Sequence, residues 1–109
     1  MLSTRTPSAT IIDEVTSWPG MEAVEGSRGE LSFRLGRREI GHLHGDRSAH
    51  FGFPKAVRAE LFAQGRIGPH PAFPDAPGWG ARRIQNDEDV RDVIALLRLN
   101  YDRMAPTSA

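Results

Sequence analysis

The alternation of apolar and polar residues between positions 30 and 44 predicts a β-hairpin. In the segment ELSFRLG, Leu31, Phe33 and Leu35 fall on one face of a strand, and the polar residues between them fall on the other. Gly36 then permits a tight turn into REIGHLH, which is predicted to be the paired strand. Similar but shorter patterns predict three further strands, at residues 21–26, 49–53 and 78–84.

Two segments have helical spacing of their apolar residues. Ser8 is expected to cap the first helix, which ends at Pro19 and Gly20. Pro54 suits the first turn of the second helix, and Gly65 ends it. The residues expected to be buried are Ile11, Ile12, Val15 and Trp18 in the first helix and Val57 and Leu61 in the second.

The longest helix is predicted near the C-terminus, with Asn86 or Asp87 as its cap. The acidic residues that follow complement the positive end of the helix dipole. Because apolar residues recur at intervals of four and three, one stripe of this helix should be largely buried. The stripe consists of Val90, Ile94, Leu97, Tyr101 and Met104.

The order of elements is helix, strands, helix, strands, helix, which is typical of an α+β domain. We expect an antiparallel sheet of about five strands with helices packed on one face. A chain of 109 residues has room for one such domain, predicted over residues 8–104, with flexible tails at 1–7 and 105–109. The face without helices is where a site would most naturally lie.

The segment GRIGPHPAFPDAPGWG, residues 65–80, contains four Pro and four Gly and cannot be a helix. At most it holds a short edge strand around His70 to Phe73. The rest is expected to form a long, shaped loop.

Composition narrows the range of functions. Fourteen basic residues balance fourteen acidic ones, so the net charge is zero and tight nucleic-acid binding is not expected. The chain has no cysteine, which excludes disulfides and thiol catalysis. No apolar run is long enough to span a membrane and the first residues lack the apolar core of a signal peptide, so a cytoplasmic location is expected.

The stretch IGHLHGD holds the densest group of chemically versatile side chains. His42 and His44 are two residues apart, so on a strand both imidazoles point to the same face. With Asp46 and with His50 or His70 nearby, they could bind a divalent metal or supply a general base. They could equally belong to a half-buried strand, with Asp46 in the turn that ends it. Because no third ligand stands at a diagnostic spacing, neither a metal nor another cofactor is expected.

Two residues outside that stretch are also candidates. His70 lies in a rigid loop, flanked by prolines, and Trp79 is either a core aromatic or the wall of a pocket. If the loop folds over the histidine face, at least one of the candidate histidines should titrate at lower pH than His50, because burial and crowding disfavour the charged imidazole. The candidate catalytic residues are therefore His42, His44 and His70, and the candidate ligand-binding residues are Asp46 and Trp79.

The chain resembles the small bacterial proteins of the luciferase-domain family in four segments, EIGHLHGD, FPKAVRAELFAQGR, PHPAFPDAPGW and DVIALLRLNYDR. The similarity runs from about Trp18 to Arg103, and GHLHGD with LLRLNY is its most specific part. Family members often have a paired His where this chain has His70 and Pro71. A looser resemblance, in the order of elements, is to the YjbR/MmcQ-like proteins, which have a frataxin-like sheet.

These resemblances imply an α+β architecture and a small organic ligand. The fungal luciferases that give the family its name oxygenate a pyrone-type luciferin without a metal or flavin, which implies cofactor-independent oxygenase or hydrolase chemistry here. Two other functions remain open. A flat, filled sheet surface would favour a non-enzymatic interaction module, and converging arginines at 37–38 and 82–83 would favour a weak, YjbR-like nucleic-acid binder.

Overall fold

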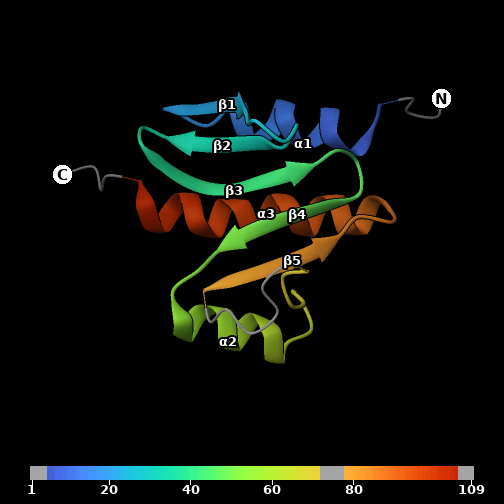
Figure 1. Cartoon of the computed structure of the whole chain (residues 1–109), viewed down its shortest axis with the longest axis vertical. Coiled ribbons are helices and arrows are strands. Elements are labelled where there is room, and N and C mark those ends of the chain that lie inside the picture. Colours follow the sequence, from blue (N-terminus) through green and yellow to red (C-terminus); the bar gives the residue numbers. More distant parts are fainter. Residues whose placement is uncertain (1–4, 72–77, 106–109) are drawn as a thin grey trace.

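Three helices and five strands make up the described part of the chain, residues 5–71 and 78–105 of the computed structural model (Figure 1). The strands form one antiparallel sheet in the order β1-β2-β3-β4-β5, so each strand pairs with its neighbours in sequence. The predicted α+β fold with a five-stranded antiparallel sheet is therefore confirmed. The elements are α1 (Pro7–Thr16), β1 (Met21–Glu25), β2 (Leu31–Leu35), β3 (Arg38–His44), β4 (Ser48–Gly52), α2 (Lys55–Ala63), β5 (Trp79–Arg83) and α3 (Asp87–Met104).

The helices are distributed unevenly around the sheet. α1 and α3 contact each other, and both contact the strands, so together they cover one face. α2 instead contacts β5 and lies beyond that edge of the sheet (Figure 1). The face opposite α3 is consequently left without a helix in the described part of the chain.

The two shorter helices begin close to the predicted starts, α1 two residues earlier and α2 one residue later. Thr6, not Ser8, is the N-cap of α1, and its side chain accepts a hydrogen bond from the Ala9 amide. Pro7 explains the difference, because its fixed φ suits the first helical position, so the cap is the residue before it, Thr6. α1 thus begins at Pro7, the last residue of the segment predicted as a tail. Pro54 likewise stands at the N-cap of α2 and not within its first turn.

The stripe predicted on α3 is only part of its buried surface. Val90, Leu97 and Tyr101 are buried, whereas Ile94 and Met104 are partly buried. The buried face is wider than predicted because α3 packs against both α1 and the sheet. The additional buried residues on α3 are Val93, Leu96 and Asn100.

The loop before β5 contains a single bridge to the sheet among its described residues. Gly68 pairs with Ala81, and the two residues exchange backbone hydrogen bonds of 2.7 and 2.9 Å. This contact falls before the edge strand predicted around His70 to Phe73, and Phe73 lies outside the described residues. Among the helices that are described, none is long and apolar enough to cross a membrane.

Candidate functional site

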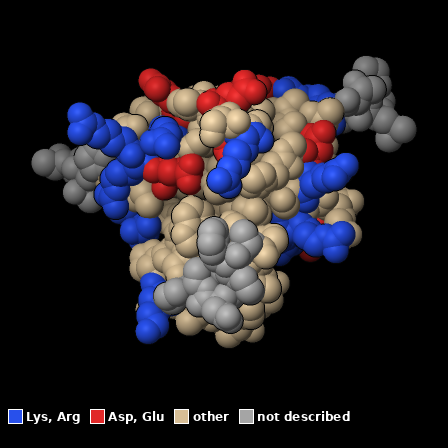
Figure 2. Space-filling model, viewed as in Figure 1, with Lys and Arg blue, Asp and Glu red and all other residues tan. Residues whose placement is uncertain are grey.

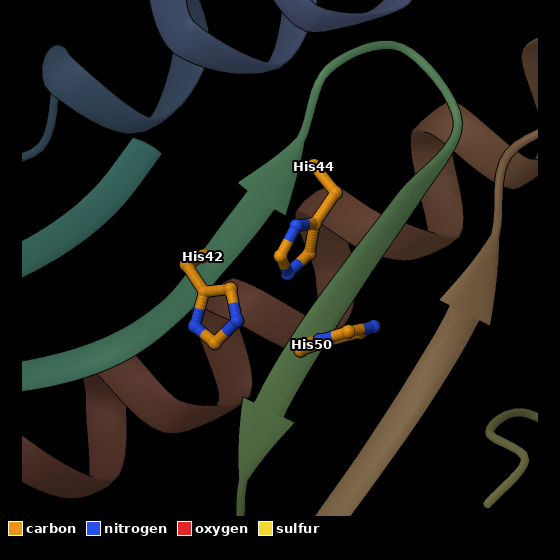
Figure 3. A group of neighbouring side chains, drawn as sticks. All are labelled: His42, His44 and His50. Atoms are coloured by element: carbon orange, nitrogen blue, oxygen red, sulfur yellow. The ribbon is translucent and has the colours of Figure 1, made fainter. Parts of the chain in front are cut away.

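The close packing of α3 on β3 determines which way the candidate histidines point. Gly41 faces α3, and a Cβ atom at this position would lie 2.7 Å from Cδ2 of Leu97. Because side chains alternate along a strand, His42 points to the opposite, open face. His50 is directly across from His42 in the register of β3 and β4. Figure 3 shows His42, His44 and His50 on the same side of the sheet, with their rings close together.

All four histidines of the chain gather on the open face. The ring centroids of His42 and His44 are 4.9 Å apart, as predicted for residues on one face of a strand, and those of His44 and His50 are 4.4 Å apart. His70 comes from the loop before β5, and its ring lies 4.3 Å from that of His50. We call these four residues the histidine cluster. Trp79 borders the histidine cluster on one side, with its ring centroid 5.9 Å from that of His42 and 5.8 Å from that of His70.

A β-bulge brings a carboxylate to the histidine cluster. Phe33 pairs with Gly41 and Arg34 pairs with Glu39, so Ile40 is an extra residue on β3. The extra residue reverses the alternation, and Glu39 points to the same face as His42 although the two are three residues apart. Nδ1 of His42 lies 3.2 Å from Oε1 of Glu39.

Glu39 is itself oriented by Ser32, which is buried on β2 directly across from His42. The Ser32 hydroxyl donates a hydrogen bond to Oε2 of Glu39. The hydrogen bond with His42, together with that from Ser32, holds the pKa of Glu39 below its usual value despite partial burial. Glu39 is therefore an ionised acceptor, and Nδ1 of His42 is the donor.

Loss of water around the rings favours the uncharged form of His44, His50 and His70. Desolvation, reinforced by the neighbouring histidines, lowers the pKa of His50 to about 4. Desolvation is also the main cause that lowers the pKa of His44 and of His70. Neutral imidazoles have a free nitrogen lone pair, so they can accept a proton or bind a metal.

His50 was expected to behave as the reference histidine, and this expectation is wrong. It is 7% exposed, in the middle of the cluster, and its pKa is the most strongly lowered. Its Nδ1 atom is buried and has no hydrogen-bond partner among the residues that the structure describes. The site thus contains a fourth histidine, His50, in addition to the three predicted candidates.

Three members of the histidine cluster could hold a metal ion. One ring nitrogen from each of His42, His44 and His50 lies within 4.8 Å of the other two. The sequence spacing lacked a third ligand because His50 belongs to the next strand. The pairing of β3 with β4 supplies it.

Asp46 is engaged elsewhere. Its carboxylate accepts a 2.9 Å hydrogen bond from the amide of Ser8 in the first turn of α1. Hydrogen bonds from the Ser8 hydroxyl and amide lower the pKa of Asp46. In this structure Asp46 tethers the β3–β4 turn to α1 and is not part of the histidine cluster.

A groove of about 860 Å³ begins at His50 and follows β5 and the loop that precedes it. Arg47 and Arg83 line it and are exposed. Arg82 also lines it but forms ion pairs of 2.7 and 2.9 Å with Asp89 and Asp92. The groove therefore has positively charged side chains close to the histidine cluster.

Some functional side chains had a signal in the sequence and others had none. His50 is one of only four histidines and follows the candidate pair in an expected strand, so it could have been included. Glu39 could not, because strict alternation places it on the face opposite His42. Only the bulge at Ile40 brings the two together.

Comparison with known proteins identifies the family. The luciferase domain family matches residues 37–100, which is more than half of the 109 residues and includes β3, β4 and most of α3. This match is shorter than the similarity expected from Trp18 to Arg103. No curated protein and no solved structure matches the chain. The looser YjbR/MmcQ-like resemblance stays a prediction. On the family match, the chain belongs to the luciferase-domain family.

Proposed function

We propose that the open face of the sheet binds a small organic ligand at the histidine cluster, and that the protein carries out oxygenase or hydrolase chemistry on it. One observation carries the proposal. Four histidines and Trp79, from β3, β4, the loop between α2 and β5, and β5 itself, converge on the face that no described helix covers. Convergent polar groups beside an aromatic wall and a groove are the usual features of a small-molecule site.

The lining of the site favours a ligand that has both a flat unsaturated part and an acidic group. The half-buried ring of Trp79 is in contact with the rings of His42 and His70. It therefore offers a surface on which a flat ligand can stack beside these histidines. Arg47 and Arg83 can attract a carboxylate or an acidic hydroxyl along the groove. Neutral imidazoles next to the bound ligand can accept a proton from it.

Ligand binding can be tested by mapping chemical shifts with a panel of small aromatic carboxylic acids and hydroxy acids. We expect the amide and imidazole resonances of the histidine cluster and the indole of Trp79 to shift together. Trp79→Ala should weaken binding about tenfold, since loss of an aromatic contact and its buried area is worth on the order of 1.4 kcal/mol. Arg47→Ala should also weaken binding of the acids.

Arg28→Ala is the matched control, because Arg28 is an exposed arginine in the β1–β2 turn, outside the residues that line the groove. It should leave the dissociation constants unchanged. If no compound in the panel shifts these resonances, or if Trp79→Ala binds as tightly as the wild type, the proposed ligand site is wrong.

A further inference from the structure

We propose that His42, His44 and His50 bind a divalent first-row transition-metal ion, such as Zn²⁺, on the open face of the sheet. This inference goes beyond the proposed function, because it assigns a cofactor to the site and does not depend on which organic ligand binds there. It also departs from two expectations of the sequence analysis, namely that the spacing of the histidines provides no third metal ligand and that the family resemblance implies chemistry without a metal.

The arrangement of the three rings suits one metal ion. His42 and His50 are a direct cross-strand pair, and His44 is the next residue on the same face of β3. Their ring centroids are 4.4 to 5.1 Å apart, and one nitrogen of each lies within 4.8 Å of the other two. Nitrogens bound to tetrahedral zinc at about 2.0–2.1 Å are about 3.3 Å apart, so small rotations of the imidazoles complete the site.

Glu39 and Ser32 form the outer support that metal-binding histidines characteristically have. Because ionised Glu39 accepts from Nδ1 of His42 at 3.2 Å, Nε2 is the nitrogen available to a metal. Ser32 holds the other carboxylate oxygen. The carboxylate also places one negative charge next to the proposed cation, which offsets part of its charge. A bulge is required to build this arrangement, and bulges recur next to functional sites.

A second, independent observation points to a ligand at His50. This side chain is 93% buried, and its Nδ1 atom has no hydrogen-bond partner among the described residues. Leaving a buried polar nitrogen without a partner is unfavourable, whereas donating its lone pair to a metal would satisfy it. His50 is also the central residue of the cluster, in ring contact with each of the other three histidines.

Three imidazole ligands leave at least one coordination position for water or for an acidic group of the ligand. His70 and Trp79 lie beside the three residues but outside the proposed ligand set, so they remain available to the organic ligand. A bound metal would bring a positive charge to the end of the groove that His50 lines.

The test is a metal titration of the full chain, stripped with a chelator and without a polyhistidine tag. Zn²⁺ binding is measured by calorimetry, and Co²⁺ binding by its visible absorption, in the absence of any organic compound. We expect one ion per chain. His44→Ala is the main variant, because His44 is exposed and its loss should not prevent folding, and it should weaken binding by more than about 100-fold. His42→Ala should act alike, and Glu39→Gln should weaken binding about tenfold, as outer-shell changes do.

Asp46→Asn is the matched control. Asp46 is exposed and lies two residues from His44, but its carboxylate accepts a hydrogen bond from the Ser8 amide and is not part of the histidine cluster. The substitution should leave the metal affinity unchanged, and thermal unfolding confirms that each variant is folded. The inference is overturned if the wild type binds no metal at micromolar concentration, or if His44→Ala and His42→Ala bind as the wild type does. Organic acids that bind without metal would preserve the proposed function in that case. Metal binding without any organic ligand would preserve only the metal site.

Discussion

His50 is the residue around which the other candidate side chains gather. Its ring contacts those of His42, His44 and His70, and it lines the start of the groove. Burial in this environment favours the neutral imidazole, because the charged form loses water and meets other histidines. A side chain that is ionisable, buried and central to a group of polar residues is typical of a functional site.

The lowered pKa of His50 predicts that stability depends on pH. In the metal-free protein its pKa is about 4, against 6.5 when unfolded, so the unfolded chain binds more protons between these values. The stabilising effect of a neutral His50 is complete above pH 6.5 and is lost as the pH falls towards 4. The loss is on the order of 3 kcal/mol. Urea unfolding with a chelator present, at a series of pH values, measures it.

His50→Gln provides the comparison, because glutamine does not titrate. This variant should lose less stability than the wild type over the same range of pH. His44 and His70, whose pKa values are also lowered, contribute in the same direction and remain in the variant. Equal pH dependence of the two proteins would contradict the assignment to His50.

At the scale of elements, Asn100 of α3 supports the bulge that builds the site. Asn100 is fully buried, and its amide group donates hydrogen bonds of 3.0 Å to the Ile40 carbonyl and 2.7 Å to the Gly52 carbonyl. Ile40 is the extra residue of the bulge. Beyond the pair of His42 and His50 the register of β3 and β4 ends, and the Asn100 side chain bridges the two strands instead.

Asn100→Leu should therefore destabilise the protein. The substitution removes the donor from the buried Ile40 carbonyl and from the partly buried Gly52 carbonyl, and a buried acceptor left without its partner costs about 1–3 kcal/mol. We expect the free energy of unfolding to fall by about 2–5 kcal/mol, measured by urea denaturation. The NMR signals of Glu39 and His42 should also shift, because the bulge positions Glu39.

Asp102→Asn is the control on the same helix. Asp102 is exposed and pairs with Arg98 at 2.9 Å, so its loss should change stability by less than about 0.5 kcal/mol. A loss for Asn100→Leu as small as that of the control would show that the bridge between the strands is not important for the fold.

At the scale of the whole molecule, the charges are paired and dispersed. Arg66 and Arg82 form a network with Asp89 and Asp92 that joins the loop, β5 and the start of α3. The basic pair at 82–83 therefore has one member already neutralised. On the face seen in Figure 2, basic and acidic side chains are both present, and neither kind forms a continuous stripe.

These features predict that the protein does not bind nucleic acid tightly. Affinity for phosphates needs an excess of basic side chains on one surface, whereas this chain has fourteen basic and fourteen acidic residues. Fluorescence anisotropy with labelled single- and double-stranded oligonucleotides at about 0.15 M salt should detect no micromolar binding. Binding that is tight under these conditions and falls steeply with added salt would contradict this prediction.

The sequence by itself determined the elements of this fold. The hairpin, the five strands and the three helices follow from local spacing of apolar residues and from Gly and Pro at the turns, because these act over a few residues. The same local rule places His42 and His44 on one face. It fails at Ser8, where Pro7 moves the cap of α1, and at Ile94 and Met104, where packing decides how much of a stripe is buried.

Only the tertiary structure decided the composition of the candidate site. His50 joins His42 through the register of β3 with β4, and His70 arrives through the course of a loop. Glu39 reaches the same face through a bulge that α3 supports with Asn100. Each contact depends on how segments far apart in the chain pack together, and apolar periodicity contains no information about register or bulges. For this reason the elements were predictable from the sequence, whereas the convergence of His42, His50 and Glu39 on one site was not.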